Sequence, residues 1–184
     1  LLPGTILRGK TTIGGAWEIG PNSMIRDCVI GDRVTINASQ LNESTVEEGT
    51  KVGPFAYVRP NCHVGRDVKV GDFVELKNST IGEGTKISHL TYVGDSDVGS
   101  HVNFGCGTVT VNYDGITKYR TTIGDDAFIG CNTNLVAPVK IGDGAYTAAG
   151  STITDEVPAD SLAIARSQQV VKKQWAAKRR SRRK

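Results

Sequence analysis

The sequence predicts an all-β solenoid, a three-sided parallel β-helix followed by a C-terminal helical and basic tail. The first observation is a repeat in which an aliphatic residue is followed by glycine, with most aliphatic positions six residues apart. The second is composition: 22 glycines and an aromatic content of only 6% suit a turn-rich protein with an aliphatic core. A six-residue period fits neither an α-helix nor a simple alternating strand, whereas it fits a prism with one short strand and one corner per repeat.

The repeat runs through most of the chain. Its aliphatic–glycine pairs begin at Ile13, Ile19, Ile30, Val52, Val64, Val70, Ile81, Val93, Val98, Ile123, Ile129 and Ile141, and degenerate repeats stand at Val58, Leu76, Ile87 and Ile153. We expect each aliphatic side chain to point inward and stack on its counterpart in the next coil. We expect the glycine to relieve the corner, where a Cβ would crowd its surroundings or φ would be positive. The prism is therefore predicted to span residues 1–155.

Three repeats make one coil of roughly 18 residues, so residues one coil apart should lie about 4.8 Å apart along the axis. Arg59 and Lys77 then occupy the same place in successive coils, and Glu75 and Tyr92 share the neighbouring corner. Two stacked cations repel each other unless an anion lies between them or they splay into water. The cluster is thus either a phosphate-binding group or a solvated set of surface charges.

The same arithmetic places His89 at the foot of a column that continues through Cys106, Cys131 and Ala149. Three coil steps span about 14 Å, a length comparable to an extended pantetheine arm. Small side chains would let such a ligand lie against the wall. The alternative is that small residues serve the packing of subunits. We interpret both cysteines as small wall residues, because no base or positive group is evident beside them.

Residues 111–122 interrupt the period and are expected to form a loop that leaves the prism at one corner. Asp114 and Gly115 give it a turn signal. Lys118, with Tyr119 and Arg120, is a candidate contact for a phosphate or ribose, and a solvated loop is the alternative.

The period stops near Pro158, and residues 156–184 are expected to form an arm, a helix that covers the last coil, and a basic tail. Arg166 should lie just beyond the coil end, above the small-residue column. The last thirteen residues, KKQWAAKRRSRRK, carry eight basic groups, so subtracting 8 from the net charge of +3 leaves about −5 for the rest. Because a nucleic-acid role would rest on this tail alone, we expect no nucleic-acid partner.

The length of the apolar runs and the spacing of the cysteines limit where the protein can reside and whether it uses disulfides or metals. No apolar run approaches the roughly 20 residues that span a membrane, so we expect no membrane insertion. Cys28, Cys62, Cys106 and Cys131 show neither a metal spacing nor a disulfide framework, so we predict reduced thiols and a cytoplasmic protein.

The hexapeptide pattern resembles the left-handed parallel β-helix of the hexapeptide acyltransferases, and the left hand is implied by that resemblance alone. Longer stretches narrow the resemblance to one family within this group. They are YVRPN, VELKNS, SHLTYVGD, VNFGCGTVTVNYDG, TKYRTTIGDDAFIG, NLVAPVKIGDGA and LAIARSQQ. They resemble the C-terminal acetyltransferase domain of the bacterial bifunctional N-acetylglucosamine-1-phosphate uridylyltransferase/glucosamine-1-phosphate acetyltransferases. No glycine-rich nucleotide loop of the other half is evident, so the uridylyltransferase domain and its Mg²⁺ are expected to be missing, and we expect no metal.

The resemblance implies transfer of an acetyl group from acetyl-CoA to the 2-amino group of glucosamine 1-phosphate, toward UDP-N-acetylglucosamine for peptidoglycan and lipopolysaccharide. It implies a homotrimer with sites between subunits. By the resemblance, His89 is the general base, and Glu75 is the acidic residue near it. The residues matching the sugar-phosphate site are Arg59, Lys77, Tyr92, Asn103 and Lys118. Those matching the acetyl-CoA site are Cys106, Asn112, Tyr113, Cys131, Ala149 and Arg166. Cys106 and Cys131 depart from the family's frequent Ala and Ser, and both keep a small side chain.

Three other functions are compatible with a β-helix. The chain could be another hexapeptide-repeat acyltransferase that acts on an amino sugar. A β-helix carbonic anhydrase needs three histidines on one metal, but His63, His89 and His101 fall on three different columns. An ice-binding scaffold needs regular threonine arrays, and the threonines here are scattered.

Overall fold

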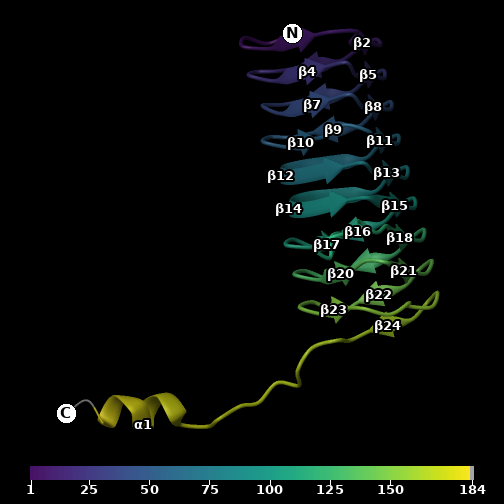
Figure 1. Ribbon diagram of the computed structural model, residues 1–184. Helices are drawn as coiled ribbons and strands as arrows, with labels where there is room; N and C mark the ends of the chain where they lie inside the picture. The colour runs from purple at the N-terminus through teal and green to yellow at the C-terminus, as the bar shows by residue number, and fades with distance from the viewer. Residues whose placement is uncertain (183–184) are drawn as a thin grey trace.

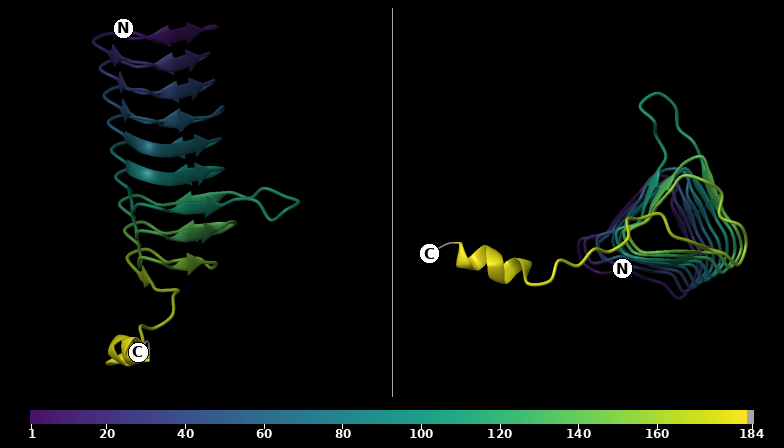
Figure 2. Two further views of the ribbon diagram at one scale, coloured as in Figure 1. Left: turned by 90° about the vertical axis from the view of Figure 1, so that its left-hand side faces the viewer. Right: turned by 90° about the horizontal axis from the view of Figure 1, so that it is seen from below.

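The computed structural model describes residues 1–182, which form a tall three-sided prism followed by an extended tail (Figures 1 and 2). Seen along its axis, the prism has a triangular outline (Figure 2). Every strand pairing within it is parallel, and each strand pairs with the equivalent strand one coil away. The prediction of an all-β parallel solenoid is confirmed. Arg183 and Lys184, the end of the predicted basic tail, lie outside the described residues.

Each side of the prism is a ladder of short strands, which we name faces I, II and III. Face I contains β1 (Ile6–Arg8), β4 (Met24–Arg26), β7 (Gln40–Asn42), β10 (Tyr57–Val58), β17 (Val109–Val111), β20 (Asn134–Val136) and β23 (Thr152–Ile153). Face II contains β2 (Thr12–Ile13), β5 (Val29–Ile30), β8 (Thr45–Val46), β11 (His63–Val64), β13 (Thr80–Ile81), β15 (Ser96–Val98), β18 (Thr121–Ile123) and β21 (Val139–Ile141). Face III contains β3 (Glu18–Ile19), β6 (Thr35–Ile36), β9 (Lys51–Val52), β16 (Asn103–Phe104), β19 (Phe128–Ile129), β22 (Tyr146–Thr147) and β24 (Leu162–Ala163).

Two longer strands join faces III and I. β12 (Lys69–Lys77) and β14 (Lys86–Gly94) run through the corner between these faces without a break. Their first residues pair with face III strands and their last residues with face I strands. They pair with each other over nearly their full length. Pairing between β12 and β14 therefore continues through this corner, although Phe73 and Leu90 have positive φ there.

The repeated aliphatic residues fill the interior as predicted. On face I, for example, Val58, Leu76 and Val93 stack in register, and each is fully buried. The degenerate repeats Ile87 and Ile153 are also buried. Burying one such side chain stabilises a fold by about 1.5–3 kcal/mol, so the core adds stability coil by coil along the axis.

The repeat glycines are needed mainly because the coils lie close together. A Cβ on Gly71 would lie 1.8 Å from the Ser88 carbonyl oxygen, and one on Gly82 would lie 2.4 Å from Gly99. Neither glycine has a positive φ. Crowding, the first of the two expected reasons, therefore explains these positions. Positive φ occurs instead mostly at non-glycine corner residues such as Asn61 and Asp95.

The chain leaves the prism twice. Residues 112–120 project as a loop between β17 and β18 (Figure 2). After β24 the chain runs away from the prism to the helix α1 (Trp175–Ser181) (Figure 1). The expectation that this helix covers the last coil is wrong, because α1 buries none of its residues. Its sequence, WAAKRRS, carries three basic residues in the last turn and lacks the apolar stripe that packing requires. In residues 1–182, no helix has the length and apolar character needed to cross a membrane.

Candidate active site

His89 lies at the corner between faces III and I, in the middle of β14. The register places Asp72 of β12 directly beside it, and His89 Nδ1 lies 3.6 Å from Asp72 Oδ1. The imidazole is 53% exposed, so it is accessible to a ligand. The sequence argument missed Asp72, although a step of one short coil back from His89 leads to it. Glu75, the predicted acidic partner, pairs instead with Tyr92 across the strands and lies beyond the corner, on face I.

The small-residue column rises from His89 as predicted from the spacing. Ile87, Phe104, Ile129 and Thr147 are paired in that order, so the residues two positions later follow one another in the same way. The Cys106 carbonyl accepts a hydrogen bond from Asn132 N, and the Cys131 carbonyl accepts one from Gly150 N, both at 2.8 Å. Cys106 is half-buried, while Cys131 and Ala149 are exposed. The column is therefore an open wall without bulky side chains.

The polar cluster on face I is neutralised by its own acids. Arg59 Nη1 lies 3.0 Å from Glu75 Oε1, and Lys77 Nζ lies 2.9 Å from Asp95 Oδ2. The stacked cations that the spacing predicted are thus two ion pairs in adjacent coils. Arg59 and Glu75 are about 40% exposed, whereas Lys77 and Asp95 are 17% and 6% exposed. Burial and full pairing hold Lys77 in place more firmly than Arg59.

Asp95 is the residue that the sequence argument missed in this cluster. The strand register continues into the corner between faces I and II, where Asn78, Asp95 and Asn112 follow one another in successive coils. Asn78 Nδ2 donates to Asp95 Oδ1 at 2.7 Å, and Asn112 Nδ2 donates to Asp95 Oδ2 at 2.5 Å. Asn112 Nδ2 also lies 3.3 Å from the Tyr92 hydroxyl. The signal was present in the sequence as three polar residues separated by steps of one short coil.

The contacts of Asp95 shift two pKa values in opposite directions. Burial raises the pKa of Asp95, but hydrogen bonds from Asn78, Lys77 and Asn112 outweigh it and leave the pKa below its ordinary value. Burial lowers the pKa of Lys77, but the hydrogen bond and charge of Asp95 outweigh that effect and leave the pKa above its ordinary value. Each partner therefore holds the other in its charged form.

The loop of residues 112–120 is a small hairpin that leaves the prism directly after this network. Tyr113 and Lys118 form an antiparallel bridge, and Asp114 Oδ1 accepts hydrogen bonds from Ile116 N and Thr117 N at 2.8 and 2.7 Å. These backbone donors lower the pKa of Asp114. Asn112 is buried at the root of the loop, whereas Tyr113 and Lys118 are exposed on it.

Three candidate residues lie apart from the face I cluster. Asn103 lies on face III, in register with Lys86, so one prism does not bring it to Arg59 and Lys77. Arg120 is held on face II by Asp97, with Nε 2.9 Å from Asp97 Oδ2, and does not extend into the loop. Arg166 lies beyond the last coil, where its Cδ would be 3.9 Å from a Cβ on Gly150. It therefore does lie above the small-residue column.

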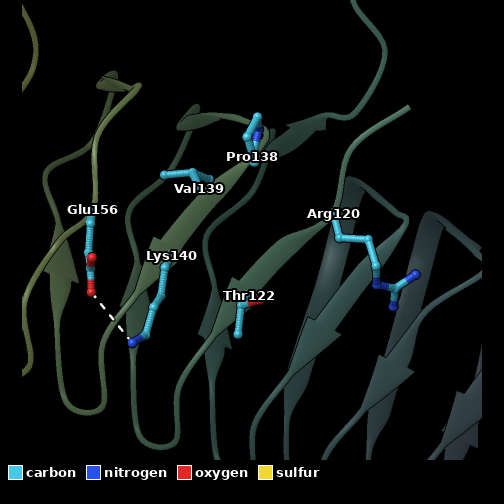
Figure 3. A pocket seen from close by; sticks show the side chains of 6 residues that line it. All are labelled: Arg120, Thr122, Pro138, Val139, Lys140 and Glu156. Atoms are coloured by element: carbon cyan, nitrogen blue, oxygen red, sulfur yellow. Dashed lines mark ion pairs between the residues drawn. The ribbon is translucent and has the colours of Figure 1, made fainter. Parts of the chain in front are cut away.

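Two hollows in the described part of the chain lie away from His89. One, of about 320 Å³, lies on face II and is lined by Arg120, Thr122, Pro138, Val139, Lys140 and Glu156 (Figure 3). Lys140 Nζ reaches toward Glu156 Oε1 there, at 3.5 Å. A second, of about 370 Å³, lies along residues 164–169 and includes Arg166. We place the candidate site along β14, because His89 lies there beside Asp72 at the foot of the small-residue wall and Tyr92 lies beside Glu75 of the face I cluster. An open wall forms no enclosed cavity by itself.

No metal site is evident in the described part of the chain, since residues 1–182 contain no group of three His, Cys, Asp or Glu side chains able to hold an ion. His63 is held on face II beside Glu47, with Nε2 2.8 Å from Oε1, and His101 lies near Asp126. The three histidines have different neighbours, as the column argument predicted.

The comparisons with known proteins concern the repeat and the fold. The family model described as bacterial transferase hexapeptide (six repeats) matches residues 43–78 and 120–155. The chain is 59% identical over 179 residues to the bifunctional protein GlmU of Clostridium kluyveri. The matched region covers 97% of this chain and 39% of that protein. The chain thus spans about two fifths of the length of the curated relatives it matches.

Solved structures share the fold at low sequence identity. The UDP-N-acetylglucosamine acyltransferase of Campylobacter jejuni matches with a TM-score of 0.68 and 14% identity, covering 89% of this chain and 71% of that one. A GDP-perosamine N-acetyltransferase mutant of Caulobacter crescentus, solved in complex with CoA and GDP-perosamine, matches with a TM-score of 0.56 and 24% identity. That match covers 62% of this chain and 52% of the other.

Proposed function

We infer that this chain, a hexapeptide-repeat protein, corresponds to the acetyltransferase part of the GlmU proteins, and we propose that it is a glucosamine-1-phosphate N-acetyltransferase. In this proposal, it transfers the acetyl group of acetyl-CoA to the 2-amino group of glucosamine 1-phosphate. The product is N-acetylglucosamine 1-phosphate, on the way to UDP-N-acetylglucosamine for the cell envelope. Four free cysteines support a reducing, cytoplasmic location.

One observation carries the proposal: a half-exposed histidine lies between a wall of small side chains and a cluster of cations. Acyl transfer to an amino sugar phosphate needs a base, a place for an extended thioester and a grip on a phosphate. His89 can supply the first, the wall of Cys106, Cys131 and Ala149 the second, and Arg59 with Lys77 the third. The order of these parts around one corner fits a base situated between two substrates.

In the proposed mechanism, the amine must be neutral to attack the thioester carbonyl. His89 takes the proton that the amine loses as the C–N bond forms, and can return it to the coenzyme A sulfur as the C–S bond breaks and coenzyme A leaves as a thiol. Asp72, whose Oδ1 lies 3.6 Å from His89 Nδ1, is placed to orient the imidazole ring. Arg59 and Lys77 orient the amine by holding the phosphate. Donors for the oxyanion would come from a backbone N–H or from Asn103 on a facing subunit.

Glu75 is proposed to act through Arg59 and not through His89. Its carboxylate lies on the Arg59 guanidinium at 3.0 Å and fixes that cation at the mouth of the site. Asn112, Tyr113 and Lys118 would line the site from the root and the stem of the loop. Arg166 would contact the far end of acetyl-CoA, beyond Ala149.

A homotrimer with sites between subunits completes the proposal. Phe55, Phe73 and Leu90 form an apolar ridge on the same corner as His89, and they are 59%, 58% and 56% exposed. The two phenyl rings stack with centroids 5.5 Å apart, and all three residues have φ between 49° and 59°, which is rare for bulky side chains. A ridge that is both exposed and conformationally costly supports contact with a neighbouring copy. That copy would also bring a face III carrying Asn103 toward face I.

The decisive experiment measures acetyl transfer from acetyl-CoA to glucosamine 1-phosphate and to a panel of other amino sugars, with and without phosphate. The proposal expects glucosamine 1-phosphate to have the highest kcat/KM, and unphosphorylated glucosamine to lose most of it. Preference for a different amino sugar would indicate another hexapeptide acyltransferase. A titration that detects no coenzyme A binding would favour a scaffold.

A further inference from the structure

Asp95 is the one carboxylate among the described residues that is buried, and the proposed reaction has so far given it no role. Its two oxygens accept hydrogen bonds from three side chains: Lys77 Nζ at 2.9 and 3.1 Å, Asn78 Nδ2 at 2.7 Å and Asn112 Nδ2 at 2.5 Å. The three donors come from the two coils on either side of Asp95. Lys77 and Asn78 lie in the coil below, and Asn112 lies in the coil above.

Two of these donors belong to different substrates in the proposed function. Lys77 is a candidate contact for the sugar phosphate, and Asn112 is a candidate contact for acetyl-CoA. Their shared oxygen is Asp95 Oδ2, which lies 2.9 Å from Lys77 Nζ and 2.5 Å from Asn112 Nδ2. One side chain therefore holds both groups at the corner between faces I and II, whereas the open wall lies at the corner between faces III and I.

We propose that Asp95 is a positioning residue that holds the sugar-phosphate contact Lys77 and the acetyl-CoA contact Asn112 on one carboxylate, so that the two substrate sites share a single support. This inference rests on the proposed function. A carboxylate suits the task because it has two oxygens that only accept hydrogen bonds. The negative charge of Asp95 also balances the positive charge of Lys77 before a phosphate binds. The ion pair therefore keeps the Lys77 side chain extended when no substrate is present.

The test compares Asp95→Asn with wild type in steady-state kinetics for both substrates. An Asn at this position has one acceptor oxygen, and its own NH₂ group would face donors. The expected result is a rise in KM of about tenfold or more for both glucosamine 1-phosphate and acetyl-CoA. Loss of one charge-assisted hydrogen bond at each site weakens binding by about this factor. kcat should fall less than either KM rises, since His89 keeps its place.

Asn78→Gly is the matched control. It removes one hydrogen bond to Asp95 but leaves the bonds to Lys77 and Asn112, and the positive φ of 47° at Asn78 suits glycine. If Asp95 has only a structural role, both variants should have lower melting temperatures, and their KM values should change in proportion to that loss of stability. The proposal predicts instead that Asn78→Gly keeps both KM values within about twofold of wild type, even if its melting temperature falls as far.

Two outcomes would overturn the proposal. One is a change in only one of the two KM values in Asp95→Asn, because the shared support would then not exist. The other is an equal effect of Asp95→Asn and Asn78→Gly on both KM values at equal stability. Failure of the proposed function looks different: wild type itself would then show no acetyl transfer to glucosamine 1-phosphate.

Discussion

At the scale of single residues, His89 is the position where the proposed chemistry is most directly exposed to test. His89→Ala should keep the fold, because the side chain is 53% exposed and contacts only Asp72 by charge. Loss of a general base lowers turnover by about 10²- to 10⁴-fold, and we expect that range in kcat. His101→Ala is the matched control, since His101 is 63% exposed in the same prism. Near-normal turnover in His89→Ala would refute the role assigned to it.

Asp95 gives a second prediction at this scale, in acid. Because the folded-state pKa of Asp95 lies below its ordinary value, its charge stabilises the fold fully above about pH 4, the usual Asp value. This stability is lost as the pH falls through the lower folded-state pKa. Denaturant unfolding of wild type and Asp95→Asn should differ most near neutral pH, and the difference should shrink below about pH 4. A difference that stays constant through this range would contradict the assignment.

At the scale of elements, the distance between coils limits what a corner can hold. Gly71→Ala would place a methyl group 1.8 Å from the Ser88 carbonyl oxygen, a backbone atom that β14 keeps fixed. Overpacking of this kind costs about 1–3 kcal/mol, so the free energy of unfolding should fall by that amount. Gly15→Ala is the control, because its nearest neighbour, Asp32 Oδ1, lies 3.7 Å away. Equal stability of the two variants would show that the coils can separate without cost.

At the scale of the whole molecule, one prism leaves its site open on one side. If the ridge of Phe55, Phe73 and Leu90 packs against a neighbouring copy, Phe73→Asp should shift the protein from trimer toward monomer. Light scattering coupled to size exclusion would measure the mass. Activity should fall with the trimer, because Asn103 and the cation cluster lie on different faces of one chain.

The control for this variant is Val29→Asp, on face II, where the side chain is 53% exposed, close to the 58% of Phe73. It should change neither the mass nor the activity. A trimer that persists in Phe73→Asp would place the contact between copies elsewhere on the prism.

The fold was more predictable than the site, and particular residues show why. A period of six in Ile and Val positions has one geometrical solution, so Val58, Leu76 and Val93 could be placed inward and in register before any coordinates. The same register correctly put His89 below Cys106. The register of the aliphatic residues did not reveal that Lys77 would have a buried acid of its own, because Asp95 belongs to a separate polar column with Asn78 and Asn112. Composition predicts a helix in the tail, but the expectation that it covers the last coil is wrong, because α1 lies free of the prism.

By itself, the sequence determined the solenoid, its inward residues, the projecting loop and the column above His89, because each follows from counting along a repeat of fixed length. Only the tertiary structure decided which charges meet. A long side chain such as Lys77 can form an ion pair with an acid in any of the neighbouring coils. The backbone at the corners determines which acids lie within pairing distance. The structure therefore supplied Asp72 beside His89 and Asp95 between Lys77 and Asn112. In the proposed site, Asp72 lies beside the base and Asp95 supports the two substrate contacts.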